Sequence, residues 1–146
     1  MQFGIKTPPQ QCSWQHMLDI WTATDQIDTF TSCWTFDHFY PLVGDKNGPC
    51  MEAWVTLTAL AVHTQRVRLG CMVNGTPYRH PTLTANMAAT LDIVSGGRLN
   101  LGLGAGWHED ECTAYGIDLL PLGPRMDRFE ESVAVIRSLL INEYTT

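Results

Sequence analysis

The sequence predicts an α/β protein of about four strand–helix units, arranged as the amino-terminal half of a (β/α)8 barrel. Segments with the pattern of a strand begin near Phe3, Thr31, Val67 and Arg98, and a helical pattern follows each of them. Their spacing of about 30 residues is the size of one βαβ unit. A complete barrel of about 250 residues holds eight units, whereas this chain has 146 residues. We therefore expect residues 1–146 to form one partial barrel domain, truncated after its fourth helix.

The first two units are defined by strand patterns that end at proline or polar residues. A strand over Gln2–Thr7 stops before Pro8, and Ser13 then stands where a helix needs its N-cap. The second strand covers Thr31–Phe36 and leads into a long loop rich in glycine and proline. Apolar residues at helical spacing follow both strands: Trp14, Met17, Leu18 and Trp21, then Trp54, Leu57, Leu60 and Ala61.

The third unit has a strand over Val67–Val73 and a helix that begins at Pro81 and ends at Gly96 and Gly97. Alternation places one apolar set on one face of this strand: Val67, Leu69, Cys71 and Val73. The helix of the fourth unit has an apolar side that needs a surface to cover. That side consists of Met126, Phe129, Val133, Ile136 and Leu140.

The fourth strand alternates between an apolar set and a set of nearly bare backbone. The two sets are Leu99, Leu101, Leu103 and Ala105, and Asn100, Gly102, Gly104 and Gly106. We expect the apolar set to pack on the helices and the glycine set to face the barrel axis, where a flat ring can approach the backbone. Alternatively, the glycines relieve strand packing or a bulge. Their GxGxG spacing does not match a phosphate loop.

Composition excludes several classes of protein. The chain is 45% hydrophobic and 16% charged, with a net charge of −6, which is typical of a globular protein and unfavourable for binding nucleic acid. No apolar run is long enough to span a membrane, and no signal pattern opens the chain, so we expect a cytoplasmic protein. Five cysteines without a CxxC pair, and histidines without an HExxH motif, predict neither a metal site nor disulfide bonds.

Candidate functional residues follow the second and fourth strands. His38 comes at the end of the second strand beside Asp37 and between aromatic residues, a position suited to acid–base chemistry at the carboxyl end of a barrel strand. A hydrogen-bonded structural histidine is the alternative. The segment Trp107–Glu111 lies just beyond the fourth strand. Within it, Glu109 and Asp110 can equally form a solvated acidic first turn of a helix.

Several motifs, in this order along the chain, resemble the luciferase-like monooxygenase superfamily. They are WTFDHF at 34–39, VRLG at 67–70, YRHP at 78–81, TLDIVSGGR at 90–98, LGLGAGW at 101–107 and GPRMDR at 123–128. Within the superfamily, the chain looks closest to oxidoreductases that use the deazaflavin coenzyme F-420. Relatives that use FMN share much of this pattern.

The resemblance implies a (β/α)8 barrel that forms homo-oligomers and binds a small-molecule substrate. The implied reaction is hydride transfer between reduced coenzyme F-420 and a small organic substrate. One alternative is an FMN-dependent monooxygenase that uses oxygen. Another is a non-catalytic half-barrel, because family members continue through about four more strands and barrel phosphate sites commonly follow strands 7 and 8.

The resemblance also implies roles for individual residues. His38 is the implied catalytic proton donor or acceptor, and a non-proline cis peptide that supports the cofactor ring maps to Met72 and Val73. The loop that begins at Asn74 departs from the pattern of relatives, which often have Thr-Gly-Asn-Thr-Tyr-Arg there. The implied cofactor-binding residues are Asp37, Met72, Val73, Asn74, Gly104, Ala105, Gly106, Trp107 and Asp110.

Overall fold

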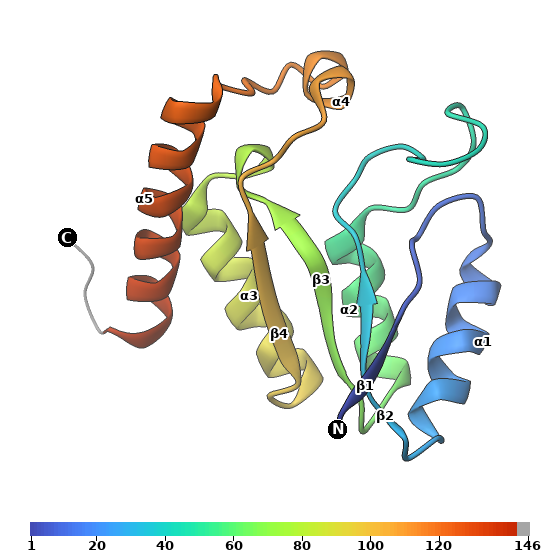
Figure 1. Cartoon of the computed structure of the whole chain (residues 1–146). Coiled ribbons are helices and arrows are strands. Elements are labelled where there is room, and N and C mark those ends of the chain that lie inside the picture. The colour runs from blue at the N-terminus through green and yellow to red at the C-terminus, as the bar shows by residue number, and fades with distance from the viewer. Residues whose placement is uncertain (143–146) are drawn as a thin grey trace.

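The computed structural model describes residues 1–142, so the last four residues of the predicted domain, 143–146, lie outside its description. Four parallel strands form one sheet in the order β1-β2-β3-β4, with α1, α2 and α3 packed on one face and α5 beside α3 (Figure 1). The elements are β1 (Phe3–Lys6), α1 (Trp14–Asp25), β2 (Phe30–Thr35), α2 (Ala53–His63), β3 (Arg68–Gly75), a 3-10 turn η1 (Thr76–Tyr78), α3 (Pro81–Ser95), β4 (Leu99–Gly104), α4 (Glu109–Ala114) and α5 (Leu122–Ile141).

This arrangement confirms the predicted fold class, the amino-terminal half of a (β/α)8 barrel. Ser13 caps α1 by accepting a hydrogen bond from the His16 N–H, and Gly96 ends α3 with a positive φ of 72°. Between the sheet and the helices lies a core of fully buried apolar residues. Its members include Met17, Trp21, Cys33, Leu57, Leu60, Val67, Leu69, Cys71 and Leu91. No helix within residues 1–142 has the length and apolar character needed to cross a membrane.

The other face of the sheet, which we call the inner face, corresponds to the barrel interior. Trp34 lies across Gly70 on this face, where an added Cβ at Gly70 would be 2.9 Å from the Trp34 ring. Next to it, the Arg68 Nε donates to the Asn100 side-chain oxygen at 2.7 Å. No other strand pairs with the outer edges of β1 and β4 among the described residues.

The end of β3 departs from regular alternation. Cys71 pairs with Leu101, but the next paired residues are Asn74 and Leu103, so β3 advances three residues while β4 advances two. The added residue is a bulge, and it reverses which side the following side chains face. The prediction that Val73 shares the buried face of β3 is therefore wrong, because Val73 is 44% exposed on the inner face.

The glycines of β4 accommodate this bulge. An added Cβ would be 3.1 Å from a Val73 methyl group at Gly102 and 2.6 Å at Gly104. The interpretation that the glycines relieve strand packing at a bulge therefore holds for these two positions. The expectation that the glycine set faces the barrel axis holds as well at Gly104, because Gly104 also borders the pocket described below.

Candidate active site

The segments that follow β2, β3 and β4 converge at the carboxyl edge of the sheet (Figure 1). The chain leaves β2 in a long loop, turns through η1 after β3, and forms the short helix α4 after β4. Carboxyl ends of parallel barrel strands are where functional side chains from different units meet. A site is therefore expected at this edge.

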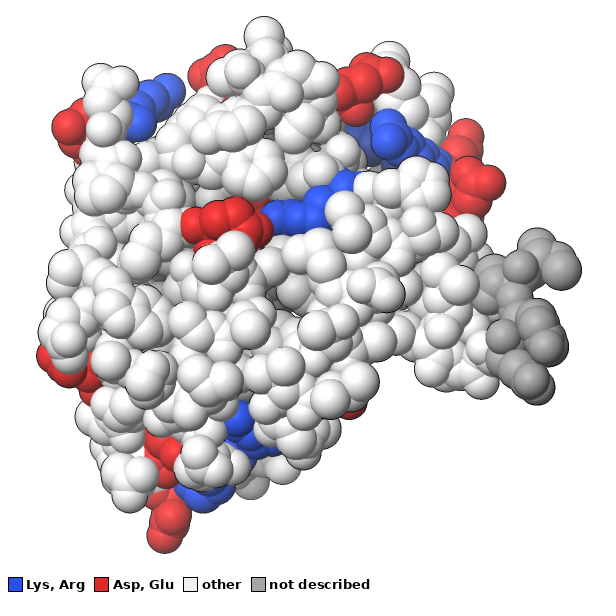
Figure 2. All heavy atoms as spheres, turned by 180° about the vertical axis from the view of Figure 1, so that it is seen from behind, with Lys and Arg blue, Asp and Glu red and all other residues white. Residues whose placement is uncertain are grey.

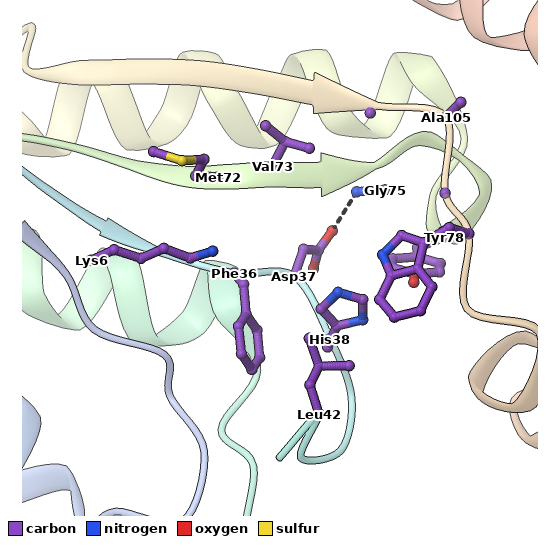
Figure 3. Close-up of a pocket in the computed structure, with 13 residues that line it drawn as sticks. Lys6, Phe36, Asp37, His38, Leu42, Met72, Val73, Gly75, Tyr78 and Ala105 are labelled. Atoms are coloured by element: carbon purple, nitrogen blue, oxygen red, sulfur yellow. Dashed lines mark hydrogen bonds between the residues drawn. The ribbon is translucent and has the colours of Figure 1, made fainter.

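A pocket of about 350 Å³ lies at this edge (Figure 3). It takes side chains from β1 and from the ends of the other three strands. Its lining consists of Lys6, Phe36, Asp37, His38, Leu42, Met72, Val73, Gly75, Tyr78, Gly104, Ala105, Gly106 and Trp107. All the site residues expected from the sequence line it, except Asn74 and Asp110.

His38 is held by a buried carboxylate. Its Nδ1 lies 2.8 Å from the Glu111 Oε2, and the Glu111 side chain is completely buried. Tyr78 donates its hydroxyl to the same oxygen at 2.6 Å, while the Phe39 N–H donates to the other carboxylate oxygen. One carboxylate on α4 thus ties together the segments that follow β2, β3 and β4.

These hydrogen bonds determine the charge of Glu111. Burial disfavours the ionised carboxylate, but donation from His38, Tyr78 and the Phe39 N–H outweighs burial and holds the pKa of Glu111 below its usual range. Burial and the neighbouring carboxylate raise the pKa of Tyr78, so its hydroxyl stays protonated as a donor. Because an ionised carboxylate only accepts, the His38 Nδ1 carries a proton, and in the neutral imidazole Nε2 is the acceptor.

Asp37 forms the second buried cluster. The Arg79 guanidinium donates to its two carboxylate oxygens at 2.6 and 2.9 Å, and the Gly75 N–H donates at 3.1 Å. Arg79 also donates to Glu52 at 2.6 Å. Burial raises the pKa of Asp37, with Arg79 and the Gly75 N–H opposing that rise. Asp37 borders the pocket, yet its oxygens are engaged in joining the loop after β2 to the end of β3.

Aromatic and apolar side chains surround His38. The rings of Phe36 and Trp107 lie edge-on to the imidazole, with centroids 5.1 and 5.6 Å away. Trp107 is 61% exposed, so its indole is available to a ligand. The peptide bond between Met72 and Val73 is cis, as the resemblance implies, and both side chains line the pocket.

Two expected cofactor contacts lie elsewhere. Asn74 is 3% exposed, and its side-chain nitrogen donates to the Gly102 carbonyl at 2.8 Å, on the side of the sheet that faces α5. The bulge in β3 causes this reversal. The Asp110 side chain is 76% exposed and lies 3.9 Å from the Lys46 amine, away from the pocket. Neither side chain lines this pocket, so a cofactor contact by Asn74 or Asp110 stays a prediction.

The sequence placed Glu111 only within the candidate segment Trp107–Glu111 and Tyr78 only within a motif of the resemblance, and it singled out neither as a partner of the His38 site. Glu109 and Asp110 are exposed, as the interpretation of a solvated acidic turn requires, whereas Glu111 and Cys112 are buried. The neighbouring Cys112 was the available signal that this side of the turn faces inward. Among residues 1–142, no three histidine, cysteine or acidic side chains are grouped as metal ligands.

The whole chain, residues 1–146, matches the luciferase-like monooxygenase family. The F-420-dependent glucose-6-phosphate dehydrogenase of Microbacterium testaceum is 31% identical over 147 residues, which are 100% of this chain and 43% of that protein. Limonene 1,2-monooxygenase of Rhodococcus erythropolis is 40% identical over 90 residues, covering 62% of this chain and 22% of that protein.

A solved structure agrees with these relationships. An F-420-dependent secondary alcohol dehydrogenase in complex with an F-420–acetone adduct superposes with a TM-score of 0.88 at 25% identity, covering 99% of this chain and 43% of that one. The chain belongs to the luciferase-like monooxygenase family, and it spans less than half the length of these relatives.

Proposed function

We propose that this chain supplies the ring-binding part of an oxidoreductase that transfers hydride between reduced coenzyme F-420 and a small organic substrate. The observation that carries this proposal is the pairing of His38 with buried Glu111 beside a largely apolar pocket with a glycine wall. The F-420-dependent relatives support the choice of cofactor.

The pocket residues fit a flat ring system. Main chain from Gly104 to Gly106 forms one wall with little side-chain bulk, and Met72 and Val73 form an apolar support. Trp107 offers an exposed indole for stacking. These residues would hold the ring, which when bound supplies the hydride chemistry.

His38 handles the proton in this proposal. Glu111 accepts a hydrogen bond from Nδ1–H, which keeps its proton. The Nε2 lone pair takes the hydroxyl proton of an alcohol as it is oxidised to a carbonyl, and in the reverse direction the imidazolium returns that proton to the oxygen of the carbonyl substrate as it is reduced. Glu111 stabilises the imidazolium that forms and keeps the ring oriented, which makes it a positioning residue. Phe36 and Leu42 narrow the pocket around the imidazole and limit access of water.

A second candidate is an FMN-dependent monooxygenase that uses oxygen. Limonene 1,2-monooxygenase favours this candidate, because its identity of 40% over 90 residues is higher than the 31% of the F-420-dependent glucose-6-phosphate dehydrogenase over 147 residues. The two candidates share the fold and the pocket and differ in the cofactor. Comparison of F-420 with FMN therefore separates them.

We further propose that the chain forms homo-oligomers through an apolar groove between α2 and α3. The groove is lined only by uncharged residues, among them Trp54, Val55, Val62 and Met87. Val55 is 72% exposed and Val62 is 58% exposed. Figure 2 shows a broad uncharged area below an adjoining acidic and basic pair, and such an area favours burial against another apolar surface.

The third alternative, a non-catalytic half-barrel, follows from the open sheet. Unpaired edges on β1 and β4 favour association with another strand, and a half-site can persist without turnover.

We place the protein in the cytoplasm, since the five cysteines are all free and a reducing compartment keeps thiols in that state.

Turnover tests the proposed function. The chain is incubated with oxidised coenzyme F-420 and a panel of small alcohols, and loss of the deazaflavin absorbance is followed. We expect at most weak turnover by the chain alone, falling by about 10²–10⁴-fold in a His38→Gln variant. Oxygen-dependent turnover with FMN instead would establish the monooxygenase. Binding of cofactor without any turnover would support the non-catalytic half-barrel.

A further inference from the structure

Lys6 is the one charged side chain of the pocket lining whose charge no described residue balances. It extends from β1 along the inner face with its amine directed towards the pocket (Figure 3). Asp37, the other charged residue of the lining, is paired with Arg79. The chain has a second lysine, Lys46, which lies 3.9 Å from Asp110 outside the pocket.

The side of the pocket away from β1 has an excess of negative charge. Asp37 and Glu52 share the single guanidinium of Arg79. The other guanidinium at this wall is that of Arg125, which donates to the Gly106 carbonyl at 3.2 Å, so the three carboxylates including Glu111 outnumber the two cations. Glu111 is ionised behind His38, and its partners other than the imidazole are neutral donors. A ligand in the pocket therefore meets a cation on the β1 side and anions behind the opposite wall.

We propose that Lys6 forms an anion subsite that selects carboxylate-bearing substrates and orients them in the pocket. Their carboxylate lies against β1, and their uncharged reacting end lies at His38. A carboxylate suits the subsite because one ammonium group balances one negative charge. A phosphate group carries closer to two charges at neutral pH, and the second would face the anionic side of the pocket. This inference rests on the proposed function in taking the pocket as the ligand site.

Flat aromatic probes that differ in charge test this subsite. The dissociation constants of 2-naphthoate, 2-naphthamide and 2-naphthyl phosphate are measured by calorimetry on the chain and on Lys6→Met, Lys6→Arg and Lys46→Met variants. Circular dichroism confirms that each variant is folded. Because the first two probes differ little in shape, the ratio of their constants isolates the effect of charge.

We expect the wild-type chain to bind 2-naphthoate about fivefold more tightly than 2-naphthamide, as a single partly solvated ion pair allows. Lys6→Met should abolish this preference, whereas Lys6→Arg and Lys46→Met should retain it. Equal binding of the two probes, absence of binding, or a preference that survives Lys6→Met would overturn the proposal. Tighter binding of 2-naphthyl phosphate would overturn the assignment to carboxylates.

The same protein separates failure of the subsite from failure of the proposed function. If the chain turns over an alcohol with coenzyme F-420 but shows no Lys6-dependent preference among the probes, the subsite is wrong and the proposed function stands. If the preference depends on Lys6 while neither F-420 nor FMN binds, the subsite stands and the assigned chemistry is wrong.

Discussion

Glu111 determines which nitrogen of His38 faces the ligand. Its carboxylate accepts from Nδ1, so the wild-type imidazole should carry its proton there and leave Nε2 free. Glu111→Gln keeps the shape but offers an amide that can donate or accept. We expect the Nε2-protonated tautomer to gain population in this variant, as measured by ¹⁵N NMR of the imidazole. Glu109→Gln, at an exposed position of the same turn, should leave the tautomer unchanged.

The lowered pKa of Glu111 also links stability to pH. A carboxyl whose folded-state pKa lies below its unfolded value of about 4.3 stabilises the fold above that pH. The contribution disappears as pH falls through the folded-state pKa. We expect the free energy of unfolding of Glu111→Gln, measured with urea, to be about 1–3 kcal/mol below that of wild type at pH 7. This difference should become smaller below about pH 4.3. A gap independent of pH would contradict the ionised, hydrogen-bonded carboxylate.

At the residue scale, sequence could predict positions but not side-chain partners. His38, Asp37 and Trp107 were expected at strand ends, and all three line the pocket. The alternation of residues cannot show a bulge, which moved Asn74 to the helix side. Nor can sequence show that Glu111 reaches His38, because the pairing joins residues 73 positions apart.

At the scale of elements, the contact between β3 and β4 depends on glycine. A Cβ at Gly104 would lie 2.6 Å from a Val73 methyl group. We expect Gly104→Ala to destabilise the fold by about 1–3 kcal/mol through overpacking, measured by chemical denaturation. Val73→Ala should recover part of that loss in the double variant, and additive effects would contradict direct contact. Gly123→Ala in α5, where no atom lies within 4 Å of the added Cβ, serves as the control.

Most elements were predictable because their patterns are local. Alternating residues and caps located β1 to β4 and the helices between them, with differences of one or two residues at the ends. The short helix α4 was expected only as an acidic turn, since six residues give too little periodicity to define a helix.

For the whole molecule, the groove between α2 and α3 predicts self-association. We expect the chain to have the mass of an oligomer by light scattering. A Val55→Glu, Val62→Glu double variant should shift it towards monomer, because a buried contact would desolvate both new charges. Ile93→Glu, at a position 80% exposed on α3 but outside the groove, should not change the mass. An unchanged mass in the double variant would contradict a contact through this groove and would favour the sheet edges instead.

The regular spacing of strand–helix units was sufficient to predict half of a barrel. The sequence could not reveal how the open pocket is completed, because relatives more than twice as long hold part of their structure beyond the region matched here. The charge imbalance around Lys6 was equally out of reach, since it depends on which carboxylates Arg79 and His38 engage in the folded chain.

The central claim is that the pocket at the carboxyl ends of the four strands binds a deazaflavin ring. Fluorescence titration of the purified chain with coenzyme F-420 and separately with FMN, alongside light scattering for its mass, tests this claim most directly. We predict saturable, micromolar binding of F-420, tighter than that of FMN. A folded, soluble chain that binds neither cofactor would contradict the claim.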